Sequence, residues 1–304
     1  MLLVIEQFLN GLQLGITLFL MSAGLTLVFG IMQVINLAHG SFYMIGAYVG
    51  ATVAAYTGSF LLAMLAAVAT AAATGCVVEI LVLRHLYARQ HLDQVLATFG
   101  LIMFFNELIR IIWGRQPLFM NVPGALAKSI QLLPGLQYPT YRLAVIGIGL
   151  LVALFLWLMF AKTRIGMQIR AGSSNREMVG ALGVNINLLY TLVFGLGAAL
   201  AGLAGVMAGP ILSVEPGMGE SILILTFVVI VIGGIGSIRG AVAGALLVGM
   251  VDTLGRAFLP SLLRTFLAAA TADSVAASLS SMAIYILMAA ILVWKPRGLF
   301  PAHG

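Results

Sequence analysis

Long apolar segments recur along the whole chain, and they restrict its fold more than any other feature. The segments at about 60–83, 95–113, 143–161 and 188–209 each approach the roughly 20 residues that a helix needs to cross a bilayer. Inside a membrane the backbone polar groups must be satisfied within the protein, so such runs fold as helices. The sequence therefore predicts an all-α, polytopic transmembrane helical bundle.

Further apolar segments raise the expected number of spans to about nine, within a range of eight to ten. They lie at about 8–29, after the break at Asn36 to Ser41 and through Tyr56, and at about 222–232, 241–258 and 282–294. A chain that is 62% hydrophobic and 8% charged has too little polar surface to cover a soluble core. We predict a single transmembrane domain over residues 1–304.

The basic residues set the predicted orientation. The net charge is +6, but the lysines and arginines are spread among loops, which argues against a nucleic-acid partner. Short loops rich in lysine and arginine stay in the cytoplasm. Lys295 and Arg297 therefore place the C-terminus inside the cell, and the chain is expected to contact membrane lipid.

Residues 162–187 form the longest polar interruption in the second half of the chain. The segment contains one acid, Glu177, and four basic residues: Lys162, Arg164, Arg170 and Arg176. This bias places it in the cytoplasm.

A short helix is predicted within this cytoplasmic segment. Ser174 and Glu177 have the spacing of a capping box, so the helix is expected to begin near Asn175. Gly183 can adopt the left-handed conformation that ends a helix, so the helix extends to about Leu182, roughly two turns.

Met178, Val179 and Leu182 give this helix an apolar face. Because two turns are not stable alone in water, we expect the helix to dock on a partner or on the chain's own membrane surface. An ordinary connecting loop with the same spacing is the alternative.

Two glycine-rich interruptions predict broken or re-entrant helices. The first contains Asn36, His39, Gly40 and Ser41, and the second is the turn Gly233–Gly240, which includes Gly236 and Ser237. His39 and Ser41 can satisfy backbone groups that the first break exposes, or they can line a path. As a base and a nucleophile they would point to different faces of a helix, which argues against an intramembrane enzyme.

Small residues recur four positions apart within the span at about 188–209. The pairs are Ala198 with Gly202, Ala201 with Gly205, and Gly205 with Gly209. This spacing lets membrane helices approach closely, so a tightly packed bundle is predicted.

Outer loops are expected where turn-forming residues gather. Four prolines between Arg115 and Arg142 exclude a continuous helix there, and residues from Pro210 to Glu220 are expected to form a second outer loop.

Ionisable residues near membrane depth are candidates for function. They are Glu79, Glu107, Arg110, Asp252 and Arg256. Two acid and base pairs among them, at i, i+3 and i, i+4, are spaced to neutralise each other on one helix face. Structural pairing is therefore the prediction for these four residues.

Motifs of nucleotide and metal chemistry are absent. The sequence contains no G-x-x-x-x-G-K-[ST] phosphate loop, no H-E-x-x-H, no paired cysteine ligands and no G-x-S-x-G elbow. No cofactor is expected in this chain, and the chain cannot itself bind ATP through a phosphate loop.

Three stretches together resemble the LivH-type permease of bacterial branched-chain amino-acid ABC transporters. They are LTLVFGIMQVINLAHGSFYMIGAYVG, RAGSSNREMVGALGVNINLLYTLVFGLGAALAGLAGVMAGP and GGIGSIRGAVAGALLVG. The resemblance covers nearly the whole chain, and the middle stretch is the most specific. It implies a multi-pass subunit of the bacterial cytoplasmic (inner) membrane that imports branched-chain or other hydrophobic amino acids by alternating access.

The resemblance also implies partners and site residues. The partners are a second permease, two cytoplasmic ATPases that bind ATP, and a periplasmic or extracellular solute-binding protein. The ATPase-coupling loop would comprise Arg170, Ser174, Arg176, Glu177, Met178, Val179, Leu182 and Gly183. The translocation path or gate would include Asn36, His39, Gly40, Ser41, Gly236 and Ser237.

Three alternatives stay open at this point. Relatives of the same family carry urea, amides or other amino acids. A stand-alone secondary transporter could use a proton or sodium gradient through Glu107 or Asp252, and a membrane scaffold or enzyme could use His39 and Ser41.

Overall fold

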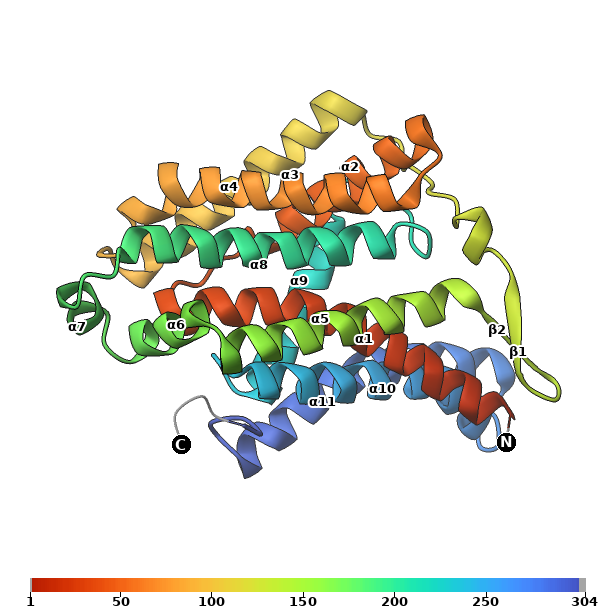
Figure 1. Ribbon diagram of the computed structural model, residues 1–304. Helices are drawn as coiled ribbons and strands as arrows, with labels where there is room; N and C mark the ends of the chain where they lie inside the picture. The colour runs from red at the N-terminus through yellow and green to blue at the C-terminus, as the bar shows by residue number, and fades with distance from the viewer. Residues whose placement is uncertain (1, 301–304) are drawn as a thin grey trace. The chain divides into compact units, whose positions relative to one another are not determined.

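The fold was analysed in a computed structural model, which describes residues 2–300 (Figure 1). The predicted all-helical membrane fold is confirmed. Within the described residues the α-helices are α1 (Leu2–Met32), α2 (His39–Thr57), α3 (Phe60–Leu81), α4 (His91–Trp113), α5 (Thr140–Lys162), α6 (Arg164–Ser174), α7 (Arg176–Ala181), α8 (Ile186–Ala208), α9 (Met218–Gly233), α10 (Ile238–Leu263) and α11 (Ala269–Trp294). Two 3-10 turns, η1 (Leu83–His85) and η2 (Gly124–Leu126), and two strands, β1 (Ser129–Leu133) and β2 (Leu136–Pro139), complete them.

Seven of the helices within residues 2–300 are long and apolar enough to cross a membrane. They are α1, α3, α4, α5, α8, α10 and α11. Helix α9 is apolar but has only 16 residues, and α2 begins with the polar sequence HGS. About nine spans are reached only if α2 and α9 also cross, so that number stays a prediction.

The proline-containing segment between α4 and α5 forms a β-hairpin. Strands β1 and β2 pair antiparallel, with Ile130 opposite Tyr138 and Gln131 opposite Gln137. Gly135 adopts a φ of +88° at the turn, which a residue with a side chain rarely does. The predicted absence of a continuous helix in this loop is confirmed.

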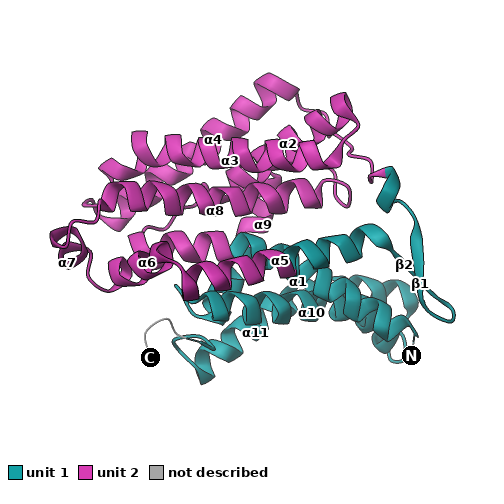
Figure 2. Cartoon of the chain, in the orientation of Figure 1, with its two compact units in different colours: residues 1–22, 124–149, 225–304 teal, residues 23–123, 150–224 magenta. Residues whose placement is uncertain are grey.

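The chain divides into two compact units (Figure 2). The first unit comprises residues 1–22, 124–149 and 225–304, and the second comprises residues 23–123 and 150–224. Helices α1, α5 and α9 each continue from one unit into the other along the chain. The single-domain assignment of residues 1–304 stays a prediction.

Helix α8 forms the core of the second unit, where it packs against α2 and α3. A Cβ atom added to Gly195 would lie 2.6 Å from Cys76 Sγ, and one added to Gly205 would overlap the carbonyl oxygen of Tyr43. These backbones approach too closely for larger residues. The close packing predicted from the small residues of this span is therefore confirmed.

In the first unit, glycines likewise allow a close backbone approach between α1 and α10. A Cβ atom added to Gly249 would lie 2.5 Å from Gly15 N and 2.6 Å from Gly11 O. In the same unit, Asn10 accepts hydrogen bonds from Tyr138, at 3.1 Å, and from Arg142. Small residues thus let α1 and α10 approach closely, and the half-buried Asn10 side chain links α1 to β2 and α5.

Candidate functional site

The first predicted break lies between α1 and α2 and covers residues 33–38. Gln33 has a φ of +54°, a left-handed conformation that is uncommon for a residue other than glycine. Asn36 is fully buried, and its Oδ1 accepts a hydrogen bond from Ala38 N at 3.1 Å. The break therefore ends before His39, Gly40 and Ser41, which form the first turn of α2.

Asn36 also carries a donor that lacks a hydrogen-bond partner among residues 2–300. Its Nδ2 is buried, and a buried unsatisfied polar group costs roughly 1–3 kcal/mol. Such a donor inside an apolar protein is a place where water or a passing solute can bind. The path role of Asn36 stays a prediction.

A close backbone contact joins the start of α2 to the start of α9. A Cβ atom added to Gly40 would overlap the carbonyl oxygen of Gly219, and the reverse is also true. His39 is fully buried and meets the edge of the Phe42 ring, with ring centroids 6.3 Å apart. Gly40 therefore has a packing role that only glycine can fill, because no side-chain atom fits between the two backbones.

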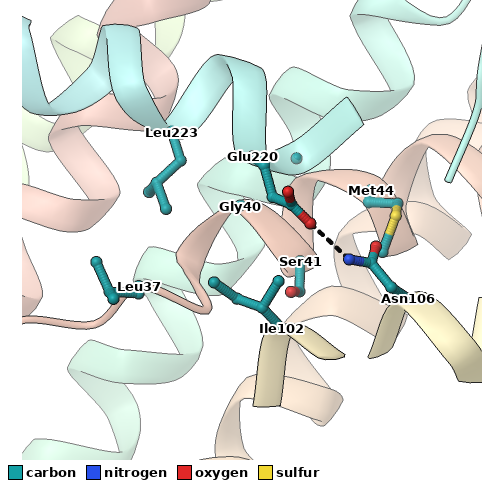
Figure 3. Close-up of a pocket in the computed structure, with 9 residues that line it drawn as sticks. Leu37, Gly40, Ser41, Met44, Ile102, Asn106, Glu220 and Leu223 are labelled. Atoms are coloured by element: carbon teal, nitrogen blue, oxygen red, sulfur yellow. Dashed lines mark hydrogen bonds between the residues drawn. The ribbon is translucent and has the colours of Figure 1, made fainter. Parts of the chain in front are cut away.

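A small pocket with a volume of about 10 Å³, room for about one water molecule, lies beside this contact (Figure 3). Ser41 is the only hydroxyl among its lining residues, and Asn106 and Glu220 supply an amide and a carboxylate. The rest of the lining is apolar or glycine: Leu37, Gly40, Met44, Ile102, Gly219 and Leu223. The pocket therefore combines an apolar wall with one charged and two neutral polar groups.

Glu220 belongs to the first turn of α9, so the prediction that it lies in an outer loop was wrong. Its Oε1 accepts a hydrogen bond from Asn106 Nδ2 at 2.6 Å (Figure 3). Gly217, with a φ of +90°, ends the loop before the helix begins at Met218. Because Gly217 and Gly219 are typical of turns, the sequence did not indicate that a helix begins at Met218.

The second predicted break lies between α9 and α10. Gly236 has a φ of +81°, and the Ser237 side chain accepts a hydrogen bond from Gly240 N at 3.1 Å. Ser237 is therefore the N-cap of α10. The path role of Gly236 and Ser237 stays a prediction.

The predicted short cytoplasmic helix is present as α7, with a different N-cap. The Oδ1 atom of Asn175 accepts a hydrogen bond from Met178 N at 3.0 Å, so Asn175 caps the helix and Ser174 does not. The preceding helix α6 extends through Ser174, which leaves the capping position to the next residue. Gly183 has a φ of +87°, as expected after a helix end.

Helix α6 was not predicted. The Thr163 side chain caps it by accepting a hydrogen bond from Gly166 N at 3.2 Å, and Arg170 donates to the carbonyl oxygen of Phe160. Thr163 was a possible N-cap in the sequence, but the basic residues of this segment were interpreted as those of a loop. Figure 1 shows α6 and α7 near the first residues of α8.

The apolar face of α7 is divided. Val179 is 6% exposed, whereas Met178 is 59% and Leu182 is 77% exposed. Arg176 and Glu177 are also exposed. Only Met178 and Leu182, four residues apart, are thus available to a partner, because Val179 packs inside the chain.

A buried polar cluster, not foreseen from the sequence, lies where α3, η1 and α8 meet. The carboxylate of Glu79 is fully buried and accepts hydrogen bonds from Arg84 at 3.0 Å, Tyr87 at 2.8 Å and Thr191 at 2.6 Å. Burial, together with the bond to Glu79, raises the pKa of Tyr87, so its hydroxyl stays a donor. Sequence proximity of Glu79 and Arg84 was the available signal.

The two predicted ion pairs are present. Arg110 pairs with Glu107, and Arg256 pairs with Asp252 at 2.9 Å. Within residues 2–300, no group of three or more histidine, cysteine or acidic residues is placed to hold a metal ion.

Seven helices within residues 2–300 that are long and apolar enough to cross a bilayer define the class of this protein, a polytopic helical membrane protein. Residues 7–292 match the family described as the permease component of branched-chain amino acid transport systems. The chain belongs to this family, and it is the permease component of a branched-chain amino acid ABC transport system.

Two curated relatives illustrate the similarity. The high-affinity branched-chain amino acid transport system permease protein BraD of Pseudomonas aeruginosa is 30% identical over 263 residues, which cover 83% of this chain and 86% of the relative. The permease protein LivH of the corresponding high-affinity system in Escherichia coli K12 is 30% identical over 270 residues, or 84% and 87%. No solved structure matches the chain. The chain is thus a multi-pass membrane transport subunit without a catalytic domain.

Proposed function

We propose that this subunit imports branched-chain or other hydrophobic amino acids by alternating access, driven through α7 by partner ATPases. The exposed pair Met178 and Leu182 carries the proposal. A six-residue helix that, together with its C-cap Leu182, presents two large apolar side chains to water is unstable by itself and is stabilised by docking into a cleft.

The assembly includes a second permease, two cytoplasmic ATPases that bind ATP, and a solute-binding protein on the outer side. Membership of the family implies ATPase and binding-protein partners. The subunit resides in the bacterial cytoplasmic membrane with its C-terminus inside, as the basic residues Lys295 and Arg297 favour.

Coupling is mechanical. ATP-driven closure of the partner ATPases moves Arg170 to Gly183, and the motion passes into α8, which begins at Ile186. Because α8 is packed by small residues against α2 and α3, it moves with them as one body. The solute passes the break at Asn36, where the buried donor of that side chain supports a polar path.

The test removes the two exposed side chains of α7 without disturbing the core. We expect Met178→Ala combined with Leu182→Ala to abolish ATP-driven leucine uptake by the reconstituted complex, while the permease still inserts into the membrane. Leu61→Ala is the control, because Leu61 is 60% exposed on α3 but does not belong to the cytoplasmic segment.

The outcome is read from uptake and from co-purification of the ATPase subunits. Loss of both in the double variant, with both retained in Leu61→Ala, supports α7 as the docking element. Wild-type uptake in the double variant contradicts the coupling role. Leucine uptake by the isolated chain under an ion gradient, with no ATPase present, would instead favour a stand-alone transporter.

A further inference from the structure

Residues 295–300, the strap, follow α11 and contact the end of α9. Leu299 N donates a hydrogen bond to Ile232 O at 2.9 Å. Phe300 N donates another to Gly233 O, also at 2.9 Å. Because the last carbonyl groups of a helix have no partner within it, the strap provides donors for two of the carbonyls that end α9. The strap is thus bonded to the residues just before the second break.

Two glycines let the strap approach this break closely. Gly298 has a φ of +82° and Gly234 a φ of +106°, conformations that a residue with a side chain rarely adopts. A Cβ atom added to Gly298 would lie 2.5 Å from Gly234 N, and one added to Gly234 would lie 2.8 Å from Phe300 O. Gly234 is the first residue of the break, which ends at Ser237, the N-cap of α10. The position of the strap therefore constrains the backbone of the break.

Three exposed cations gather around the strap and the break. Lys295 and Arg297 belong to the strap, and Arg239 belongs to the first turn of α10. Packing brings this turn to the end of α9, because a Cβ atom added to Gly233 would overlap Gly240 O. The strap is bonded to the same end of α9, so the fold collects the three charges from two separate segments.

No carboxylate balances these cations. Among residues 2–300, none of Arg239, Lys295 and Arg297 has an ion-pair partner within 4.0 Å. The sequence after α9 contains two acids, Asp252 and Asp273, and each already pairs with another arginine. The three charges are therefore available to an anionic partner.

The last turn of α11 indicates what surrounds the strap. Val293 is 87% exposed and Trp294 is 76% exposed, and both belong to a helix long and apolar enough to cross a membrane. Large apolar side chains exposed on such a helix face lipid, and tryptophan is typical of the membrane–water interface. Lys295 Nζ lies 5.4 Å from the centre of the Trp294 ring. The strap therefore begins at the level of the lipid headgroups.

We propose that the strap binds the headgroup of an anionic phospholipid through Arg239, Lys295 and Arg297, and that the bound lipid keeps the strap closed on the second break. The inference deepens the proposed function, on which it rests for the cytoplasmic side of the C-terminus. A phosphate group carries the negative charge and the acceptor oxygens that match these cations, and arginine binds phosphate through paired N–H donors. Basic residues that follow a transmembrane helix on the cytoplasmic side are attracted to anionic lipids.

The rival partner for the same cations is an acidic surface of an ATPase subunit. The exposed side chains of Val293 and Trp294 favour lipid, because lipid tails cover the apolar turn while the headgroups meet the cations directly after it. Since the strap is bonded to α9, the lipid stabilises the junction of α9 and α10. Uptake then depends on the lipid as well as on the ATPases.

The test removes charge from the strap without touching its backbone bonds. Lys295→Gln combined with Arg297→Gln takes away two of the three cations. Arg115→Gln combined with Lys128→Gln is the matched control, because it makes the same chemical changes at two exposed residues between α4 and α5. Both double variants lower the net charge of the chain equally.

The purified transport complex is placed in bilayers of phosphatidylcholine, with or without phosphatidylglycerol, and hydrogen exchange of the Leu299 and Phe300 amides is measured. We expect phosphatidylglycerol to slow this exchange about tenfold and to raise ATP-driven leucine uptake in the wild type and in the control. The strap variant should show neither response. Salt at about 1 M should abolish the difference in the wild type, because it screens charges beyond roughly 3 Å.

A second variant tests whether the lipid acts through the strap. Gly298→Ala keeps the three cations but forces the strap away from Gly234. We expect its leucine uptake to lose the response to phosphatidylglycerol. A wild-type response of uptake in this variant would show that the lipid acts elsewhere on the permease.

Two further results would overturn the inference. The first is equal exchange of the wild type in both lipid mixtures, and the second is an undiminished lipid response in the strap variant. If the wild type shows no lipid response and the strap variant loses its ATPase subunits during purification, the cations belong to the ATPase contact instead. In each of these cases ATP-driven leucine uptake by the wild type still stands, so the failure is distinct from a failure of the proposed function.

Discussion

The hydroxyl of Thr191 lies 2.6 Å from the Oε2 atom of Glu79, and this contact joins the second turn of α8 to the end of α3. The same hydroxyl accepts a hydrogen bond from Arg84 at 2.9 Å. Because α8 begins five residues after α7 ends at Ala181, the contact fixes the first helix that follows the proposed coupling element. The cluster around Glu79 is thus placed to keep α8 and α3 together when α7 moves.

The contribution of Thr191 can be measured directly. We expect Thr191→Val to lower the free energy of unfolding by roughly 1.5–3 kcal/mol, because the buried carboxylate of Glu79 loses a donor that the valine cannot replace. Thr191→Ser keeps the hydroxyl and serves as the control. The readout is thermal unfolding in detergent, and equal stability of the valine variant and the wild type would contradict the role of this bond.

The hydroxyl of Tyr87 gives a prediction about pH. The pKa of Tyr87 is raised above its ordinary value of about 10 by burial and by its bond to Glu79. The neutral hydroxyl therefore contributes its full stability below pH of about 10, and this contribution is lost only as the pH rises through the higher folded-state pKa. The stability difference between the wild type and Tyr87→Phe should be constant from about pH 6 to 9.

This difference is obtained from unfolding temperatures of both proteins at each pH. Titration of other groups affects the two proteins alike and cancels in the comparison. A difference that shrinks between neutral pH and about pH 9 would mean that Tyr87 loses its proton in this range, contrary to the buried hydrogen bond.

Packing of α8 predicts a large effect from a single methyl group. Gly205→Ala places a Cβ atom against the carbonyl oxygen of Tyr43, a backbone atom that cannot rotate away. We expect a loss of roughly 1–3 kcal/mol from overpacking, seen as a lower unfolding temperature and a lower yield of folded protein. Gly100→Ala on α4 is the control, because no heavy atom lies within 4 Å of the added Cβ, and it should be harmless.

Substitutions at the start of α7 can distinguish the predicted N-cap, Ser174, from the observed N-cap, Asn175. Asn175→Ala removes the acceptor for Met178 N and should destabilise α7 by about 1 kcal/mol, whereas Ser174→Ala should have little effect. Hydrogen exchange of the peptide that covers residues 173–183 measures both variants. Faster exchange in Ser174→Ala than in Asn175→Ala would contradict the observed cap and favour the capping box predicted from the sequence.

Elements that depend on local pattern were predictable. The apolar length of the spans, the helix end at Gly183 and the pairs Glu107–Arg110 and Asp252–Arg256 involve residues a few positions apart. The close packing of α8 was also visible, because small residues four apart identify a face that a helix can bring close to its neighbours.

Other features needed the fold. Whether Ser174 or Asn175 caps α7 depends on where α6 ends, and adjacent residues with similar capping tendency do not decide this. Glu220 was assigned to a loop with the turn-forming residues before it, although it lies in the first turn of α9 and accepts a hydrogen bond from Asn106, 114 positions away in sequence.

The sequence by itself determined that this chain is a polytopic helical membrane protein, since apolar length and loop charge act locally along the chain, and the resemblance of three of its stretches to a family indicated a permease. Only the tertiary structure decided which polar residues meet. Thr191 reaches Glu79 across 112 positions, and Asn106 reaches Glu220 across 114. Such partners are chosen by how the helices pack, and no local pattern in the sequence encodes that choice.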